Sequence, residues 1–128
     1  MRLGKPLRVL IAENHPDLSE AVARIIDTEP DMCCVGQVPS VTDVSRAARD
    51  ASADALVLDL SLQGGSSLTL IEELATSMPD LRIVVFSGLA DAEAAARETK
   101  KRGAAEFVSK GSDINVLLAA IRRHPNGA

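Results

Sequence analysis

The sequence contains no tryptophan, no tyrosine and only two phenylalanines, so aromatic residues make up 2% of its 128 residues. A hydrophobic core must therefore come from valine, isoleucine, leucine and alanine, which pack well on a parallel sheet. Hydrophobic residues in total reach 46% and charged residues 25%, which are ordinary values for a globular protein. At this length we expect one domain.

Cysteine is also scarce, with Cys33 and Cys34 adjacent in an apolar stretch. A zinc site would need further cysteine or histidine at ligand spacing, and the sequence lacks it. We expect two buried, reduced thiols that act as small hydrophobic residues.

Long apolar runs and excess positive charge are missing as well. No run approaches the ~20 apolar residues that span a bilayer, and the first residues have no long apolar segment of the kind found in signal peptides. The net charge is −4, whereas a nucleic-acid interface needs a basic face. We therefore expect a cytoplasmic protein without membrane contact, which would touch DNA only through a segment absent here.

What the sequence has is a fivefold alternation of apolar runs and amphipathic stretches. Alternation with short connections is typical of an α/β fold, a doubly wound parallel sheet covered by helices. We expect a domain over residues 1–124 and a loose tail at 125–128. The expected strands are 7–12, 32–38, 55–59, 81–87 and 105–109, and the expected helices are about 17–29, 41–50, 68–78, 91–102 and 112–123.

Several residues indicate where these helices begin or end. Asp17 with Glu20 three residues later fits a capping box, and Ser40 and Ser112 are suited to cap the second and last helices. Gly103 follows the basic end of the fourth helix, as a C-cap glycine would.

Polar side chains follow the strongest strands of the predicted sheet. Glu13 and Asn14 come after the first strand, Asp59 ends the third, Ser87 the fourth, and Lys110 follows the fifth. The carboxyl ends of parallel strands share one edge, where open α/β sheets bind ligands. Carboxylates there suit Mg²⁺, and an ammonium group and a hydroxyl suit a phosphoryl group, so Asp59 is a candidate nucleophile.

Three motifs in register carry a family resemblance: Leu56-Val57-Leu58-Asp59, Val84-Val85-Phe86-Ser87-Gly88 and the Gly103–Lys110 stretch. In order and spacing they resemble the receiver domains of two-component response regulators, which are CheY-like. The turn at residues 13–16 and the ending at 118–123 look most like the NarL/FixJ subfamily, which carries a LuxR-type DNA-binding domain after the receiver.

The resemblance implies a flavodoxin-like fold with strand order 2-1-3-4-5. It also implies that Asp59 accepts a phosphoryl group from a sensor histidine kinase, with Lys110 and Ser87 assisting. Ser87 and Phe107 would form the switch pair. Such a domain regulates by self-phosphorylation and is not a conventional turnover enzyme.

The resemblance also implies a Mg²⁺ site and several partners. The metal ligands would be Glu13, Asp59, the Ser61 backbone carbonyl and, weakly, Asn14. The face formed by the fourth helix, fifth strand and fifth helix would change its partner preference, and a homodimer could use that face or the first and fifth helices. DNA would be contacted through an output domain absent here, for regulation of transcription.

Three residues depart from the family pattern: Asn14 replaces a second acid, Gln63 a common proline and Ser67 a common glycine. They leave an alternative open, a degenerate receiver that acts as a phosphorylation-independent interaction module. A small flavin-binding or hydrolytic α/β protein is a third reading, which the acidic first loop disfavours. We interpret His15 as a polar residue near a helix start.

Overall fold

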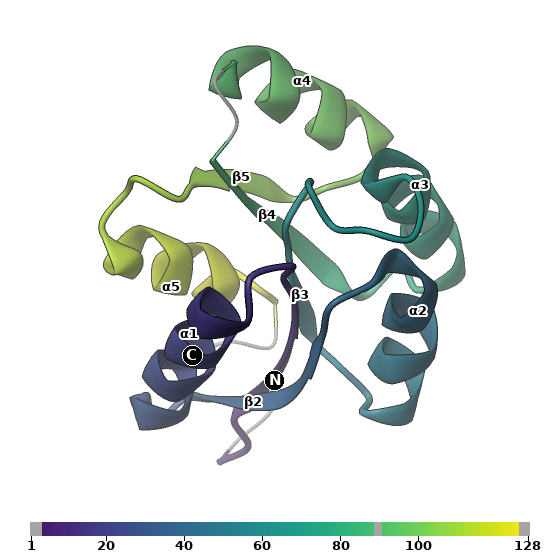
Figure 1. Cartoon of the computed structure of the whole chain (residues 1–128). Coiled ribbons are helices and arrows are strands. Elements are labelled where there is room, and N and C mark those ends of the chain that lie inside the picture. The colour runs from purple at the N-terminus through teal and green to yellow at the C-terminus, as the bar shows by residue number, and fades with distance from the viewer. Residues whose placement is uncertain (1–3, 89–90, 126–128) are drawn as a thin grey trace.

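The computed structural model describes residues 4–88 and 91–125. Within them, five strands alternate with five helices, as predicted (Figure 1). Residues 126–128 of the expected loose tail lie outside the described part. The strands are β1 (Leu7–Ala12), β2 (Met32–Val38), β3 (Ala55–Leu58), β4 (Arg82–Ser87) and β5 (Glu106–Ser109). The helices are α1 (Pro16–Thr28), α2 (Val41–Asp50), α3 (Ser67–Ser77), α4 (Ala92–Arg102) and α5 (Ile114–Arg122).

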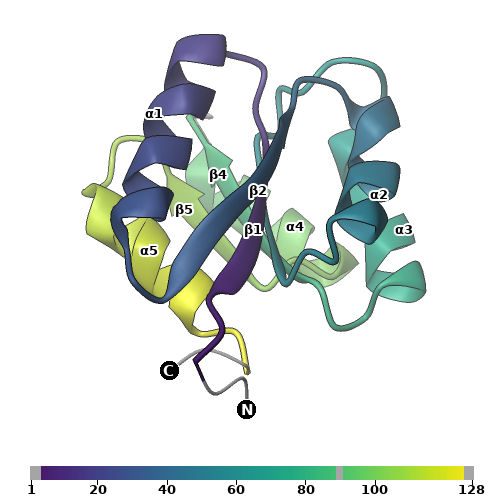
Figure 2. The ribbon, with the colours of Figure 1, turned by 90° about the horizontal axis from the view of Figure 1, so that it is seen from below.

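The five strands form one parallel sheet in the order β2-β1-β3-β4-β5, which confirms the predicted order. Helices α1 and α5 cover one face, and α2, α3 and α4 cover the other (Figure 2). This is the flavodoxin-like arrangement. The chain leaves β1 in one direction along the sheet and returns to its other side with β3, which creates the switch point at which such sheets bind ligands.

The core consists of two aliphatic layers, one on each face of the sheet. Leu10, Leu56 and Ile83 from the three central strands are essentially inaccessible, because helices cover these strands on both sides. Phe86 is buried in the layer beneath α1 and α5, whereas Phe107 is partly buried and packs against the opposite layer. Branched aliphatic residues therefore fill the interior, as the composition predicts.

The edge strand β2 departs from the expectation for its cysteines. Cys33 and Cys34 are partly exposed rather than buried, because β2 has a neighbour on one side and its register shifts between Val9 and Leu10 of β1. The Oδ1 atom of Asp27 on α1 accepts a hydrogen bond of 2.8 Å from the Cys34 amide. Burial nevertheless raises the pKa of the Cys34 thiol.

Two of the predicted helix starts were wrong by one or two residues. Helix α1 begins at Pro16, with His15 at the N-cap and without a side-chain cap, so Asp17 is not the cap. Proline favours the first helical position because its missing N–H would have had no partner there. Glu20 pairs with Arg24 one turn later instead of closing a capping box.

The last helix is capped by Asp113, whose side chain accepts a hydrogen bond from the Asn115 amide, and not by Ser112. The other two predictions are confirmed. Ser40 caps α2 through the Thr42 amide, and Gly103 is the C-cap of α4 with a φ of 123°. Both carboxylates and hydroxyls cap well, so sequence alone did not choose between neighbours.

Ion pairs tie α5 to the strands and loops at the amino end of the sheet. Glu106 on β5 pairs with Arg82 on β4 and accepts hydrogen bonds of 2.7 and 2.5 Å from Arg123. Arg122 pairs with Glu29 and, at 2.6 Å, with Asp31 before β2. Hydrogen bonds from Arg123 hold the pKa of Glu106 below its ordinary value, against the opposing effect of burial.

Glu106→Gln is expected to reduce the free energy of unfolding by about 1 kcal/mol at pH 7. Since the pKa of Glu106 is depressed in the folded protein, the ionised carboxyl stabilises it above about pH 4.5, and this contribution disappears as the pH falls further. Urea unfolding at pH 7 and pH 3 measures the effect. The gap between variant and wild type should narrow at pH 3, whereas Glu73→Gln, at an exposed position of α3, should match wild type at both values.

Candidate functional site

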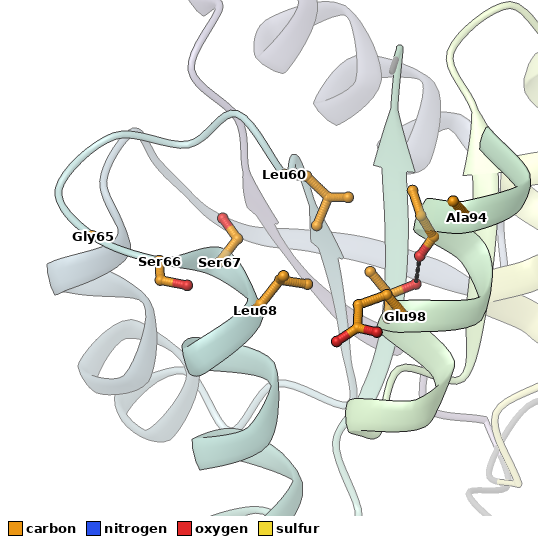
Figure 3. Close-up of a pocket in the computed structure, with 9 residues that line it drawn as sticks. Leu60, Gly65, Ser66, Ser67, Leu68, Ala94 and Glu98 are labelled. Carbon is orange, nitrogen blue, oxygen red and sulfur yellow. Dashed lines mark hydrogen bonds between the residues drawn. The ribbon is translucent and has the colours of Figure 1, made fainter. Parts of the chain in front are cut away.

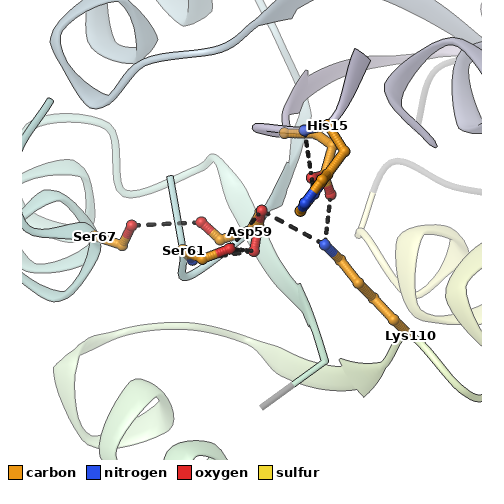
Figure 4. A network of polar contacts seen from close by, with 6 residues as sticks. His15, Asp59, Ser61, Ser67 and Lys110 are labelled. Carbon is orange, nitrogen blue, oxygen red and sulfur yellow. Dashed lines mark hydrogen bonds and ion pairs between the residues drawn. The ribbon is translucent and has the colours of Figure 1, made fainter. Parts of the chain in front are cut away.

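The site is built around Asp59, the first residue after β3. Its amide donates to the Ala12 carbonyl at 2.9 Å and so extends the pairing of β3 with β1. This places its side chain at the carboxyl edge of the sheet with 1% of its surface exposed. Glu13, which follows β1, is 5% exposed, and Lys110, which follows β5, reaches into the same space (Figure 4).

One ammonium group bridges two carboxylates at this edge. The Nζ atom of Lys110 lies 2.9 Å from Glu13 Oε1 and 3.5 Å from Asp59 Oδ2. The structure thus brings together three residues that lie far apart in the sequence, because their strands end on the same side. The formal charge of the three is −1, which leaves the pocket attractive to a cation.

Ser61 holds the Asp59 carboxylate from the other side. Its amide and hydroxyl donate to Asp59 Oδ1 at 3.0 and 2.9 Å, and the hydroxyl also lies 3.0 Å from Oδ2. Burial acts to raise the pKa of Asp59. The hydrogen bonds from Ser61 and the positive charge of Lys110 act in the opposite direction, and the pKa of Asp59 lies below its ordinary value. Asp59 is therefore an ionised, oriented carboxylate at neutral pH.

His15 belongs to this cluster, although sequence reasoning assigned it no such place. Its backbone N–H donates to Glu13 Oε2 at 3.0 Å, and its Nδ1 lies 2.9 Å from the same oxygen. One potential ligand atom from each of Glu13, His15 and Asp59 can be chosen so that all three lie within 4.8 Å of one another. The signal in the sequence was the position of His15 two residues after Glu13 and directly before a helix-starting proline.

The other predicted residues contribute in different ways. Ser87 ends β4 with 2% of its surface exposed, and its carbonyl accepts a 3.0 Å hydrogen bond from the Lys110 amide. Phe107 lies on β5, partly buried, on the same side of the sheet as α4. Asn14 is partly buried and lines a shallow pocket of about 280 Å³ between α1 and the end of β2.

Comparison with known proteins agrees with this geometry. The sequence profile described as "Response regulator receiver domain" matches residues 9–122. The chain belongs to this family. The methanol utilization control regulatory protein MoxX of Paracoccus denitrificans is 34% identical over 126 residues, which cover 97% of this chain and 56% of that protein. The receiver domain thus spans about half the length of the curated relatives that it matches.

Solved structures place it in the same group. A LuxR-family two-component response regulator from a species of Aurantimonas superposes with a TM-score of 0.84 and 26% identity, over 91% of this chain and 83% of that one. A response regulator from Burkholderia pseudomallei gives a TM-score of 0.80 and 25% identity, over 91% of this chain and 67% of that one. The Burkholderia structure contains a phosphorylated aspartic acid, a calcium ion and citrate.

The loop after Asp59 in this receiver domain is anchored on α2. The Gln63 carbonyl accepts a 2.8 Å hydrogen bond from the Val41 amide at the start of that helix. Gly64 next to it has a φ of 90°, and a Cβ there would lie 2.3 Å from Ser40 Oγ. Only glycine fits this approach without displacing the helix cap. Gln63 therefore contacts α2 through its backbone carbonyl.

Ser67 lies between the site and a neighbouring pocket. Its buried hydroxyl donates a long hydrogen bond of 3.4 Å to the Asp59 carbonyl. On its other side it lines a pocket of about 500 Å³ between α3 and α4, together with residues that include Leu60, Leu68, Ala94 and Glu98 (Figure 3).

The helices of the receiver domain are short. Among residues 4–88 and 91–125, we find none with the length and apolar character that crossing a bilayer requires.

Proposed function

We propose that this receiver domain accepts a phosphoryl group on Asp59 from a sensor histidine kinase. The observation that carries the proposal is the state of Asp59: almost inaccessible, ionised, and held between Ser61 and Lys110 at the ligand-binding edge of the sheet. Carboxylates in such positions act as nucleophiles when their charge is balanced during the reaction.

In the proposed reaction, an Asp59 carboxylate oxygen attacks phosphorus of the phosphohistidine. The new O–P bond forms as the N–P bond breaks, and the kinase imidazole leaves with the electron pair and takes up a proton. The positive charge of Lys110 offsets the negative charge brought by the phosphoryl oxygens. The Ser61 amide and hydroxyl keep the carboxylate turned toward the donor.

The donor set fits a divalent cation. Glu13 and Asp59 supply two buried carboxylates, and we assign them as ligands with the Ser61 carbonyl, while Asn14 adds a neutral, weaker group. Mg²⁺ uses few protein ligands and retains water and phosphate oxygens. When bound, such an ion reduces repulsion between Asp59 and the incoming phosphoryl group.

We further propose that phosphorylation is read through Ser87 and Phe107. The Ser87 hydroxyl would turn toward the phosphoryl group, and Phe107, which is partly buried, would move inward behind it. The face of α4, β5 and α5 would then change its partners. By analogy with the LuxR-family relative, we infer that this occurs in the cytoplasm and controls an attached DNA-binding domain, with dimers through this face or through α1 and α5.

Incubation with a small phosphodonor such as acetyl phosphate, with and without Mg²⁺, tests this function. Intact mass should rise by one phosphoryl group when Mg²⁺ is present, and peptide mapping should locate it on Asp59. A phosphorylated histidine kinase should transfer the group in the same way. An unchanged mass with both donors would contradict the proposal and favour the phosphorylation-independent module.

A further inference from the structure

The amide of Asn14 leaves the cation site of this domain short of one negative charge, and the structure holds a different donor nearby. His15 follows Asn14 directly and contacts Glu13, which is itself at the site. This set of ligands differs from an all-oxygen set in the divalent ion that it would select.

The net negative charge of the site attracts a cation, but it is too small to select Mg²⁺ over other divalent ions. Glu13 and Asp59 are two carboxylates, and the ammonium of Lys110 lies within 3.5 Å of both, so the local formal charge is −1. The number of charged ligands is a main determinant of affinity for hard cations such as Mg²⁺. An imidazole adds no charge, but it binds first-row transition metals through its nitrogen.

The contact with Glu13 prepares His15 for this role. The Nδ1 atom of His15 lies 2.9 Å from Glu13 Oε2, so one ion can reach both atoms. Without an ion, the Nδ1–H donates to this carboxylate, because a carboxylate is only an acceptor. A neutral imidazole can carry its proton on either ring nitrogen, so Nδ1 can become a ligand when the proton lies on Nε2.

The side chain of His15 has no competing structural task in the helix that follows it. It occupies the N-cap of α1 but makes no side-chain cap hydrogen bond, and 65% of it is exposed. Pro16 occupies the first helical position, where its fixed φ angle suits the helix. The backbone of His15 is thereby held between the end of β1 and the start of α1. An exposed ring beside two buried carboxylates leaves the solvent side of the site open to an entering ion.

We propose that His15 is a ligand of the divalent cation in this domain, beside Glu13 and Asp59, and that it shifts the preference of the site from Mg²⁺ toward Mn²⁺. The proposal rests on the proposed function for the place of the cation. It adds a ligand and a metal preference to that function. Mn²⁺ accepts carboxylate oxygens as Mg²⁺ does, and it binds imidazole more readily.

Mn²⁺ binding to the unphosphorylated domain can be measured by electron paramagnetic resonance, because the signal of free Mn²⁺ weakens when the ion binds. The absence of tryptophan and tyrosine excludes the usual intrinsic fluorescence titration. Mg²⁺ affinity follows from competition against Mn²⁺. We expect Mn²⁺ to bind at least ~10-fold more tightly than Mg²⁺, and His15→Ala to weaken Mn²⁺ binding ~10-fold while Mg²⁺ affinity changes less than ~2-fold.

Asp17→Ala is the matched control, because Asp17 is an exposed acid in the first turn of α1 and lies outside the cluster. It should weaken both ions by the same small factor and leave their ratio unchanged. A thermal melt should show that His15→Ala folds like wild type, since the backbone donor to Glu13 remains. Equal losses for both ions in His15→Ala, or no loss for Mn²⁺, would overturn the proposal.

The outcome is separable from that of the phosphorylation assay. Uptake of a phosphoryl group on Asp59 with an unchanged metal ratio in His15→Ala would refute the role of His15 alone. A His15-dependent preference for Mn²⁺ in a domain that takes up no phosphoryl group would refute the proposed function and leave the metal site standing.

Discussion

Asp59→Asn is expected to take up no phosphoryl group from acetyl phosphate or from a phosphorylated kinase. The amide has nearly the same shape as the carboxylate, but it lacks the charge and the nucleophilic oxygen on which the reaction depends. The measurement is the intact mass after incubation with donor and Mg²⁺, compared with wild type under the same conditions.

The Asp59→Asn variant should remain folded, which separates loss of chemistry from loss of structure. Its amide oxygen can still accept a hydrogen bond from Ser61, and Lys110 keeps Glu13 as a partner at 2.9 Å. We expect the free energy of unfolding to change by less than about 2 kcal/mol. Glu13→Gln is the companion variant. It should weaken cation binding and so slow phosphoryl uptake without abolishing that uptake. Uptake at an unchanged rate in Asp59→Asn would place the acceptor elsewhere.

Lys110→Met is expected to have two effects of opposite sign. Phosphoryl uptake should slow about 100-fold, because one positive group that balances the transferring charge is lost. Divalent cations should bind at least about 10-fold more tightly, since the charge at Glu13 and Asp59 changes from −1 to −2 and unit charges ~4 Å apart interact by ~1 kcal/mol even in water. The rate follows from mass spectrometry over time, and the affinity from Mn²⁺ titration.

Without a divalent ion, Lys110→Met should also be less stable, because two nearly inaccessible carboxylates lose their common partner. Added cation should restore much of this stability. Lys101→Met removes a lysine from the exposed last turn of α4 and serves as the control, with rate, affinity and stability like those of wild type. A Lys110→Met variant with wild-type cation affinity would show that the ammonium does not share the pocket in solution.

Much of this architecture was accessible from the sequence because the strands are short, apolar and separated by clear helical stretches. Asp59 and Lys110 could be placed at one edge without coordinates, since parallel strands end together. The contribution of Ser61 could not be foreseen, because its amide and hydroxyl reach Asp59 through the conformation of a turn. The same holds for the Gln63 carbonyl on the Val41 amide.

The two errors at helix starts have a common physical origin in competition between neighbouring residues. Pro16 and Asp17 both suit a helix start, and Pro16 occupies the first helical position. His15 is therefore the N-cap residue, and its amide donates to Glu13. Ser112 and Asp113 both suit a cap, and the carboxylate took it. Cys33 and Cys34 were expected to be buried because their neighbours are apolar, although the expected strand order already placed their strand at an edge.

The hydrogen bond from the Cys34 amide to Asp27 has a consequence for self-association. An outermost strand with free amides invites another molecule to continue the sheet, which leads toward fibrils. In this domain the Asp27 carboxylate on α1 already accepts a hydrogen bond from the Cys34 amide on β2. A second molecule that paired with β2 at this position would have to displace that charged group. Extension of the sheet from β2 by a second molecule is therefore less favourable than at an edge whose amides are all free.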